Sequence, residues 1–322
     1  MPRYRTLLAG GAGYLGQMIA KTLLATGRRV TVLDNLLHGQ ELSLTGPDFS
    51  FIQGDIRDIS LVRSLMADHE EAVLLAALVG EPACNLCPQE ALEINYLAAL
   101  NLAETARATG VKRFIFASTD SCYGVREKEI LTELSPLSPI SLYADLKARA
   151  ETAILARGFE KEFSPTVLRM ATVYGLAPRM RFDLAVNLLA REATLKGKVK
   201  IFSGEQWRPM VHVADAARAF QLTLDAPPEL VAGQIFNVGS DTQNIQFKAL
   251  GRLLAETVPG TVIETVPQVP DLRDYFVSFR KIQKILDFQP SFSLADGLKE
   301  INKSLKEGLF PDPYAKQYAN CR

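Results

Sequence analysis

Short apolar runs alternate with longer amphipathic stretches through the first half of this 322-residue chain. Runs such as residues 72–77 and 114–117 have the length and unbroken hydrophobicity of strands buried on both faces of a sheet. The amphipathic stretches carry apolar residues at helical spacing, as in residues 14–26, which Gly27 follows. The pattern predicts strands at residues 6–9, 29–33, 49–53, 72–77, 114–117 and 165–169, and helices at residues 14–26, 60–67, 89–109 and 143–157.

Strands and helices in this order predict an α/β fold, with a Rossmann-like, doubly wound parallel sheet covered by helices on both faces. Beyond residue 170 the pattern loosens, and prolines interrupt shorter elements. We therefore expect a sheet domain over residues 1–170 and a smaller, mixed α/β substrate-binding region over residues 171–322. Residues 211–240 are expected to return in part to the first layer, because 211–224 have the pattern of a strand followed by a helix.

Composition and charge exclude several classes of protein. Lys and Arg number 36 and Asp and Glu number 36, so the overall basic excess typical of nucleic-acid-binding proteins is missing. No apolar run approaches the roughly 18 residues of a membrane-spanning helix, and the apolar stretch near the start is too short for a signal peptide. Because the whole chain has only four cysteines, we expect a cytoplasmic protein with reduced thiols. The Cys84-x-x-Cys87 pair lacks a second ligand pair nearby, so no metal site is predicted.

A glycine-rich turn joins the first strand to the first helix. Gly10, Gly13 and Gly16 lie within Gly-Gly-Ala-Gly-Tyr-Leu-Gly, where glycine allows a tight turn and close approach of a pyrophosphate to the backbone. The helix that follows directs its free N–H groups and positive dipole end at those phosphates. Asp34 ends the second strand, where a carboxylate can accept hydrogen bonds from ribose hydroxyls and repel a 2′-phosphate. This arrangement predicts a dinucleotide site that favours NAD over NADP.

Tyr143 and Lys147 are four residues apart and share one face of a predicted helix. A nearby ammonium stabilises a phenolate and lowers the pKa of the tyrosine, which can then exchange a proton with a substrate alcohol. This pair alone is weak evidence, because many solvated helix faces carry the same two residue types.

Taken together, the motifs resemble those of the extended short-chain dehydrogenase/reductases, in particular the NAD-dependent nucleotide-sugar epimerase/dehydratase family. The matching segments span most of the chain in the order of the family. They are residues 10–16, 34–36, 54–58 and 75–78, Asn95, residues 116–124, Tyr143 with Lys147, and residues 169–175, 208–215 and 236–239.

The resemblance implies a role for particular residues. It implies a cofactor site formed by Gly10, Gly13, Tyr14, Leu15, Gly16, Asp34, Asn35, Leu36, Asp55, Ile56, Leu75, Ala76, Ala77, Asn95, Tyr143 and Lys147. It implies that Thr119 bonds the reacting sugar hydroxyl, that Tyr143 is the base and that Lys147 assists it. Arg208, with Arg273 as a second candidate, would bind the substrate diphosphate, and Thr172 and Arg179 are further candidates for substrate contacts. A homodimer is also implied, formed by the helices at residues 89–109 and 143–157.

One departure from the family bears on the reaction. Family dehydratases have Thr-Asp-Glu where this chain has Thr119, Asp120 and Ser121, so the glutamate that would abstract a C5 proton is absent. The favoured interpretation is a nucleotide-sugar 4-epimerase that acts through a 4-keto intermediate. A ketoreductase or an atypical dehydratase of the same family remains open, as does a catalytically silent NAD-binding regulator. The nucleotide, the sugar and the reacting carbon are not readable from the sequence.

Overall fold

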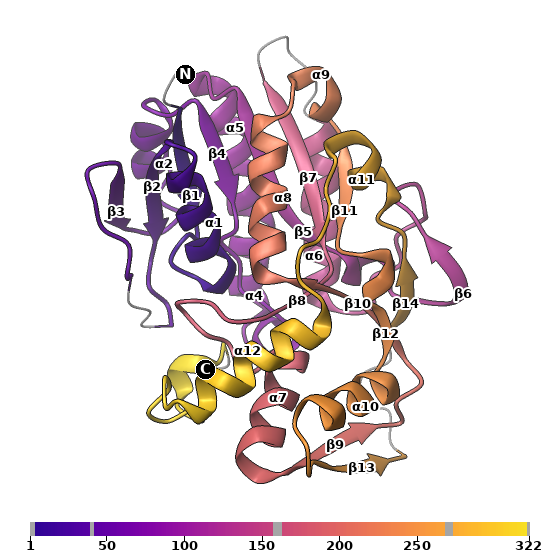
Figure 1. Cartoon of the computed structure of the whole chain (residues 1–322). Coiled ribbons are helices and arrows are strands. Elements are labelled where there is room, and N and C mark those ends of the chain that lie inside the picture. The colour runs from indigo at the N-terminus through magenta and orange to yellow at the C-terminus, as the bar shows by residue number, and fades with distance from the viewer. Residues whose placement is uncertain (1–3, 39–41, 157–162, 268–272, 321–322) are drawn as a thin grey trace.

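The computed structural model describes residues 4–38, 42–156, 163–267 and 273–320 (Figure 1). The strands are β1 (Arg5–Ala9), β2 (Arg29–Asp34), β3 (Phe49–Gln53), β4 (Glu71–Leu74), β5 (Arg113–Thr119), β6 (Val125–Leu131), β7 (Ser164–Met170), β8 (Thr172–Tyr174), β9 (Lys198–Phe202), β10 (Trp207–His212), β11 (Ile235–Val238), β12 (Asn244–Gln246), β13 (Val262–Val266) and β14 (Asp274–Val277). The α-helices are α1 (Tyr14–Ala25), α2 (Ile59–Met66), α3 (Glu81–Leu86), α4 (Pro88–Leu92), α5 (Ala99–Thr109), α6 (Leu142–Ala156), α7 (Ala185–Lys196), α8 (Val213–Asp225), α9 (Pro228–Val231), α10 (Phe247–Thr257), α11 (Arg280–Leu286) and α12 (Leu294–Lys306). A π-helical segment, η1 (Glu93–Ala98), and three 3₁₀ segments, η2 (Asp120–Tyr123), η3 (Asp241–Gln243) and η4 (Lys316–Tyr318), complete the helical elements described.

The largest sheet has seven strands in the order β11-β7-β5-β4-β1-β2-β3, counted over the described residues, and all its pairings are parallel. Chain order therefore reverses at β1, which lies between β2 and β4. In sheets of this kind, ligands bind beyond the carboxyl ends of the strands at the reversal. The predicted doubly wound parallel sheet is confirmed, and its topology locates the first place to look for a site.

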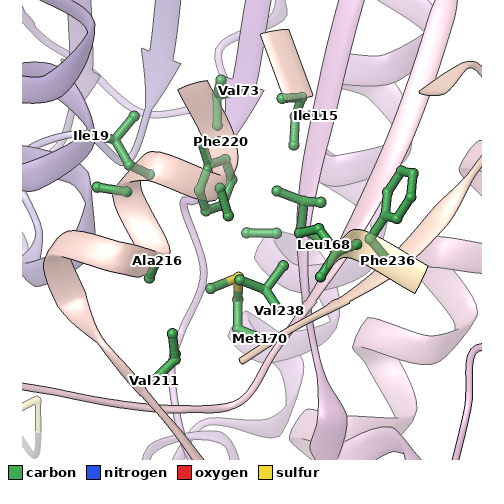
Figure 2. Packing of buried hydrophobic residues seen from close by; sticks show 14 of the residues in the cluster. Ile19, Val73, Ile115, Leu168, Met170, Val211, Ala216, Phe220, Phe236 and Val238 are labelled. Atoms are coloured by element: carbon green, nitrogen blue, oxygen red, sulfur yellow. The ribbon is translucent and has the colours of Figure 1, made fainter. Parts of the chain in front are cut away.

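Side chains of the central strands alternate between two cores, one on each face of the sheet. Leu8 packs with Ile19 and Phe220 beneath α1 and α8, which lie side by side on one face (Figures 1 and 2). Leu7 and Leu102 belong to the core on the other face, where α2, α5 and α6 pack. Burial on both faces explains why the strands are continuously apolar in sequence.

Two predicted elements differ from the structure. The helix expected over residues 89–109 is divided into α4, the π-helical segment η1 and α5. The strand expected over 72–77 ends at Leu74, because the amides of Leu75 and Ala76 both bond to the carbonyl of Ala9. Residues beyond Leu74 are thereby released from the sheet and become available to line a site.

The segment 211–240 contributes to the first layer in a different way from the one expected. Helix α8 covers the large sheet and β11 joins its edge beside β7. The strand that starts before residue 211 is β10, and it pairs instead with β8 and β12 in a separate three-stranded sheet. The position beside β7 at the edge of the large sheet is held by β11, and β10 lies in the separate sheet.

The second region packs α7, α10 and α12 around an apolar core of its own that includes Phe182, Val199 and Leu298. Two further parallel pairs, β9 with β13 and β6 with β14, complete its sheets. After α12 the chain continues through Lys316–Tyr318 and returns to residues 179–183. No helix among the described residues is long and apolar enough to cross a membrane.

Candidate active site

A cavity of about 680 Å³ opens beyond the carboxyl ends of β1, β2, β4 and β5, at the reversal in strand order. Its wall includes the glycine turn, the helix face that carries Tyr143 and Lys147, and side chains of the second region. The predicted site residues in the wall are Gly10, Gly13, Tyr14, Leu15, Gly16, Asp34, Asn35, Asp55, Ile56, Leu75, Ala76, Ala77, Thr119, Tyr143, Lys147, Thr172, Arg179, Arg208 and Arg273. The fold thus brings together residues as distant in the chain as Gly10 and Arg273, which are 263 positions apart.

The glycine turn depends on glycine at two points. Gly10 has φ +85°, and a Cβ there would lie 2.3 Å from the backbone nitrogen of Ala76. At Gly16 a Cβ would lie 2.6 Å from the Cα of Gly11, so the start of α1 packs directly on the turn. Gly13 caps α1 without a side-chain hydrogen bond, which leaves the helix N-terminus to an anionic ligand.

Asp34 holds this turn as well as lining the cavity. Its Oδ2 accepts a 3.0 Å hydrogen bond from the amide of Ala12, and its Oδ1 accepts one of 2.9 Å from the amide of Leu36. Burial raises the pKa of the Asp34 carboxyl, although these amides favour the charged form. Nearby, the Arg57 guanidinium holds the pKa of Asp55 at about 2, so Asp55 is a paired carboxylate.

Two residues predicted to bind cofactor are outside the cavity wall. Asn95 is buried behind it, where its side-chain amide accepts from the amide of Leu78 (2.7 Å) and donates to the carbonyl of the same residue (2.9 Å). Asn95 therefore secures the loop after β4 from behind. Leu36, in a left-handed conformation with φ 56°, is also absent from the wall, whereas Leu37 lines it.

Thr119, Tyr143 and Lys147 face the cavity from two elements. Thr119 ends β5, and its Oγ1 accepts a 3.2 Å hydrogen bond from the amide of Ser121. Lys147 is one helical turn from Tyr143 on α6, and its Nζ lies 4.1 Å from the centre of the Phe116 ring. Burial lowers the pKa of Lys147 to about 8.

The pKa of Tyr143 differs from the sequence prediction. Burial raises the pKa of the phenol above its ordinary value, and the neighbouring Cys122 thiol adds to this effect. A desolvated phenol resists ionisation, and here desolvation outweighs any help from the nearby ammonium. Cys84 and Cys122 are buried next to the pair, with thiol pKa values raised to about 11 and about 12, so both are unreactive packing residues.

A second cluster, missed by the sequence reasoning, surrounds Asp120. This carboxyl is buried, and its Oδ1 accepts a 3.2 Å hydrogen bond from the hydroxyl of Tyr275 on β14. Burial raises the pKa of Asp120 to about 7, while Arg208 and Arg273 favour its charged form. Tyr275 is 155 residues from Asp120, so no local pattern in the sequence links them.

The two candidate diphosphate-binding arginines reach the Asp120 cluster from β10 and from the residue that precedes β14. Arg273 Nη1 donates to the Oγ of Ser121 at 3.4 Å, and its Nε lies 3.6 Å from the carboxylate of Glu81. Arg208 is buried, stacks over the Tyr275 ring at 5.1 Å and hydrogen-bonds the carbonyl of Arg273. The fold thus gathers cationic side chains beside Thr119.

The family model described as "NAD dependent epimerase/dehydratase family" matches residues 6–239. This chain belongs to that family. A dTDP-glucose 4,6-dehydratase of Streptomyces niveus is 28% identical over 92% of this chain and 91% of its own length. A UDP-glucose 4-epimerase of Mycolicibacterium smegmatis is 30% identical over 91% of this chain and 96% of its own length.

Solved structures of the family match the fold as a whole. A UDP-glucose 4-epimerase of Thermotoga maritima, solved with UDP-glucose, has a TM-score of 0.84 at 28% identity, over 95% of this chain and 100% of its own. MoeE5 in complex with UDP-glucuronic acid and NAD has a TM-score of 0.82 at 28% identity, over 94% and 99% of the two chains. The protein is therefore an NAD-dependent enzyme of the epimerase/dehydratase family.

The cavity fits this cofactor on physical grounds. The uncapped start of α1 suits a pyrophosphate, and the turn excludes the side chains that would block it. The Asp34 carboxylate at the end of β2 suits ribose hydroxyls. Bound NAD supplies a site that accepts and returns a hydride.

Proposed function

We propose that this enzyme is a 4-epimerase of a nucleotide-linked sugar and that it acts through a 4-keto intermediate. Support comes from one combination of residues: Thr119, Tyr143 and Lys147 share a cavity with the NAD-type glycine turn, and Ser121 stands beside them where family dehydratases have glutamate. The Oγ of Ser121 is engaged by Arg273 and lies 3.5 Å from the hydroxyl of Tyr275. A neutral hydroxyl so held is a poor base for a C5 proton.

In this proposal Tyr143 takes the proton of the C4 hydroxyl and later returns one to the C4 oxygen. Thr119 shares a hydrogen bond with that oxygen, and Lys147 stabilises the phenolate as it forms. Because burial raises the pKa of Tyr143, its phenolate depends on a nearby positive charge. Arg208 and Arg273 bind the diphosphate, which lets the sugar turn over in the cavity while its nucleotide stays bound.

An atypical dehydratase is the second candidate, favoured by Asp120 alone. Its pKa of about 7 makes the carboxyl a proton donor near neutral pH, as departure of a hydroxyl group requires. Loss of water also needs a base for the C5 proton, which Ser121 does not provide.

The test incubates the purified protein with UDP-glucose, UDP-galactose, UDP-glucuronic acid and dTDP-glucose in D₂O, without added cofactor. A 4-epimerase interconverts C4 isomers with no loss of water and no deuterium at C5. A dehydratase product has lost one water and carries solvent deuterium at C5, whereas a ketoreductase leaves these four sugars unchanged and instead consumes one NADH for each molecule of a 4-keto nucleotide-sugar supplied. Either of the last two results contradicts the proposal.

Tyr143→Phe tests the mechanism on whichever substrate reacts. The change removes one hydroxyl and keeps the ring, so folding and NAD binding should survive. Loss of a general base costs about 10²–10⁴-fold in rate, and we expect turnover to fall by that amount. Turnover within about threefold of wild type, far outside that range, would mean that Tyr143 is not the base.

A further inference from the structure

The loop of residues 175–184, between β8 and α7, is fixed directly over the start of α1. The hydroxyl of Tyr14, the first residue of α1, donates a 2.7 Å hydrogen bond to the carbonyl of Gly175. Asn187 Nδ2 donates to the same hydroxyl at 3.3 Å and to the carbonyl of Arg181 at 2.9 Å. The loop therefore covers the turn where the dinucleotide pyrophosphate fits.

The C-terminal segment of residues 318–320 is hydrogen-bonded to this loop at three points. The amide of Phe182 donates to the carbonyl of Tyr318 (2.8 Å), and Arg179 Nη2 donates to the carbonyl of Ala319 (3.3 Å). The amide of Asn320 donates to the Oδ2 of Asp183 (3.1 Å). These bonds make the chain's last described residues part of the cavity wall, which Asn320 lines.

Within this arrangement, two buried polar atoms lack a partner among the described residues. They are the Nε of Arg179, a side chain 6% exposed, and the Oδ1 of Asn320, a residue 8% exposed. A buried polar group without a partner costs free energy, so its presence at a ligand cavity points to a missing ligand atom. Arg179 needs an acceptor and Asn320 Oδ1 needs a donor. A nucleotide offers both, as phosphate oxygens and ribose hydroxyls.

We propose that Arg179 binds the diphosphate of the NAD and that Asn320 accepts a hydrogen bond from one of its ribose hydroxyls. The C-terminal segment thereby completes the cofactor site. This proposal rests on the cavity holding NAD, and it assigns Arg179 to the cofactor, whereas the sequence resemblance suggested a substrate contact. Arg181, the neighbouring cation, is already paired with Asp183 at 2.6 Å.

The cationic side chains in the cavity wall form two groups, one at the proposed cofactor site and one at the candidate site for the substrate diphosphate. Arg208 and Arg273 lie at Asp120 and Ser121, whereas Arg179 interacts electrostatically with Asp34 at the end of β2. Burial lowers the pKa of Arg179 to about 10, with Arg181 adding to the effect, and a bound diphosphate would offset both. Two separate cationic points suit two diphosphates, one in the cofactor and one in a nucleotide-sugar.

The test measures binding to protein stripped of nucleotide, by calorimetry, with NAD, ADP-ribose, adenosine and UDP as separate probes. For Arg179→Gln we expect NAD and ADP-ribose to bind about 10- to 100-fold more weakly, since a charge-assisted hydrogen bond is lost. Adenosine and UDP should bind as they do to wild type. Asn320→Ala and a chain ending at Tyr318 should weaken NAD to a smaller extent, and saturating NAD should restore turnover in both.

The matched control is Arg191→Gln. Arg191 also hydrogen-bonds the chain after α12, at the carbonyl of Pro313, just before the C-terminal segment, but it does not line the cavity, so its loss should leave NAD binding unchanged. If Arg179→Gln does not fold, Arg179→Lys provides a second variant: it keeps the charge but lacks the guanidinium Nε–H, so NAD should still bind more weakly, though by less than in Arg179→Gln. Unchanged NAD binding in the Arg179 variants, or a loss of binding confined to UDP, would overturn this inference and leave the proposed function standing. A wild-type protein that binds no NAD would overturn the cofactor site as a whole.

Discussion

Thr119, Asp120 and Ser121 are consecutive residues with three different chemical environments. Thr119 is the last residue of a buried strand, Asp120 is desolvated against Tyr275, and Ser121 is held by Arg273, which immediately precedes β14. At this scale function depends on which group carries a proton, and burial raises the pKa of the Asp120 carboxyl to about 7, well above its ordinary value. Two predictions follow from carboxyl groups in the cavity wall.

Asp34 should give the enzyme a preference for NAD over NADP. Its carboxylate is fixed by the amides of Ala12 and Leu36 and would face the extra phosphate of NADP. Because like charges placed together cost several kcal/mol, we expect NADP to bind more than about tenfold less tightly. The preference should shrink as the pH falls and the carboxyl takes up a proton. Calorimetric titration with both nucleotides checks this, and equal or tighter NADP binding would contradict it.

Asp120 should make the protein less stable as the pH rises towards 7. Burial raises its pKa to about 7 in the folded state from an ordinary value of 3.8, so between these pH values folding takes up a proton. The neutral carboxyl stabilises the fold at low pH, and this contribution is lost as the pH rises through 7. The free energy of unfolding of wild type relative to Asp120→Asn should therefore fall between pH 5 and pH 8, by a few kcal/mol. Urea denaturation of both proteins measures it; a difference independent of pH would refute the shifted pKa.

Helix α6 carries Tyr143 and Lys147, and a buried ion pair joins it to β7. Both the Nε and the Nη2 of Arg169 bond to the carboxylate of Glu151, and the side chains are 3% and 2% exposed. Arg169 Nη1 also donates to the hydroxyl of Tyr123, which donates to Asn237 on β11. The network fixes the position of the helix that carries Tyr143 and Lys147 against the sheet.

Glu151→Leu should destabilise the protein by about 3–5 kcal/mol, because it leaves a buried guanidinium without its partner. The double variant Glu151→Leu/Arg169→Met should lose much less than the sum of the two single changes. Asp145→Ala is the control on the same helix: its exposed pair with Arg149 should contribute about 1 kcal/mol or less. Urea denaturation of wild type, the two single variants, the double variant and Asp145→Ala gives the comparison, and additive single losses would argue against a coupled pair.

The strands and helices of the large sheet can be predicted from the sequence because each buried strand consists mainly of apolar residues. Leu7 and Leu8 of β1 are an example, since they pack into the cores on opposite faces. The glycine turn can be predicted for a similar reason. The backbone of Gly11 lies so close to Gly16 that no larger residue fits at that position, and the sequence therefore has glycine there. Contacts between distant segments leave no local pattern. The bonds of Asp120 to Tyr275 and of Arg179 to Ala319 span 155 and 140 residues and emerge only from the fold.

At the scale of the whole molecule, the large sheet and the second region each have their own core, and the cavity lies where the two meet. The predicted cofactor-binding residues come mainly from the sheet and its loops, and the candidate diphosphate-binding arginines come from β10 and from the residue before β14. The cavity wall is therefore formed by segments from both ends of the chain, and Asn320 is part of it. The remaining whole-molecule property is assembly.

We predict a homodimer formed by the helical segments over residues 88–109 and by α6. These segments pack together, and the Arg149 guanidinium of α6 lies 4.7 Å from the centre of the Tyr96 ring in η1. Leu97, the next residue, is 45% exposed, and a second copy would bury it. Leu97→Glu should place a charge in that interface, where an unpaired charge costs several kcal/mol, and give a monomer in light scattering at micromolar concentration. Val262→Glu, at a more exposed site on β13 in the second region, should leave the dimer intact. A monomeric wild type would refute the assembly, and a dimer retained in Leu97→Glu would place the interface elsewhere.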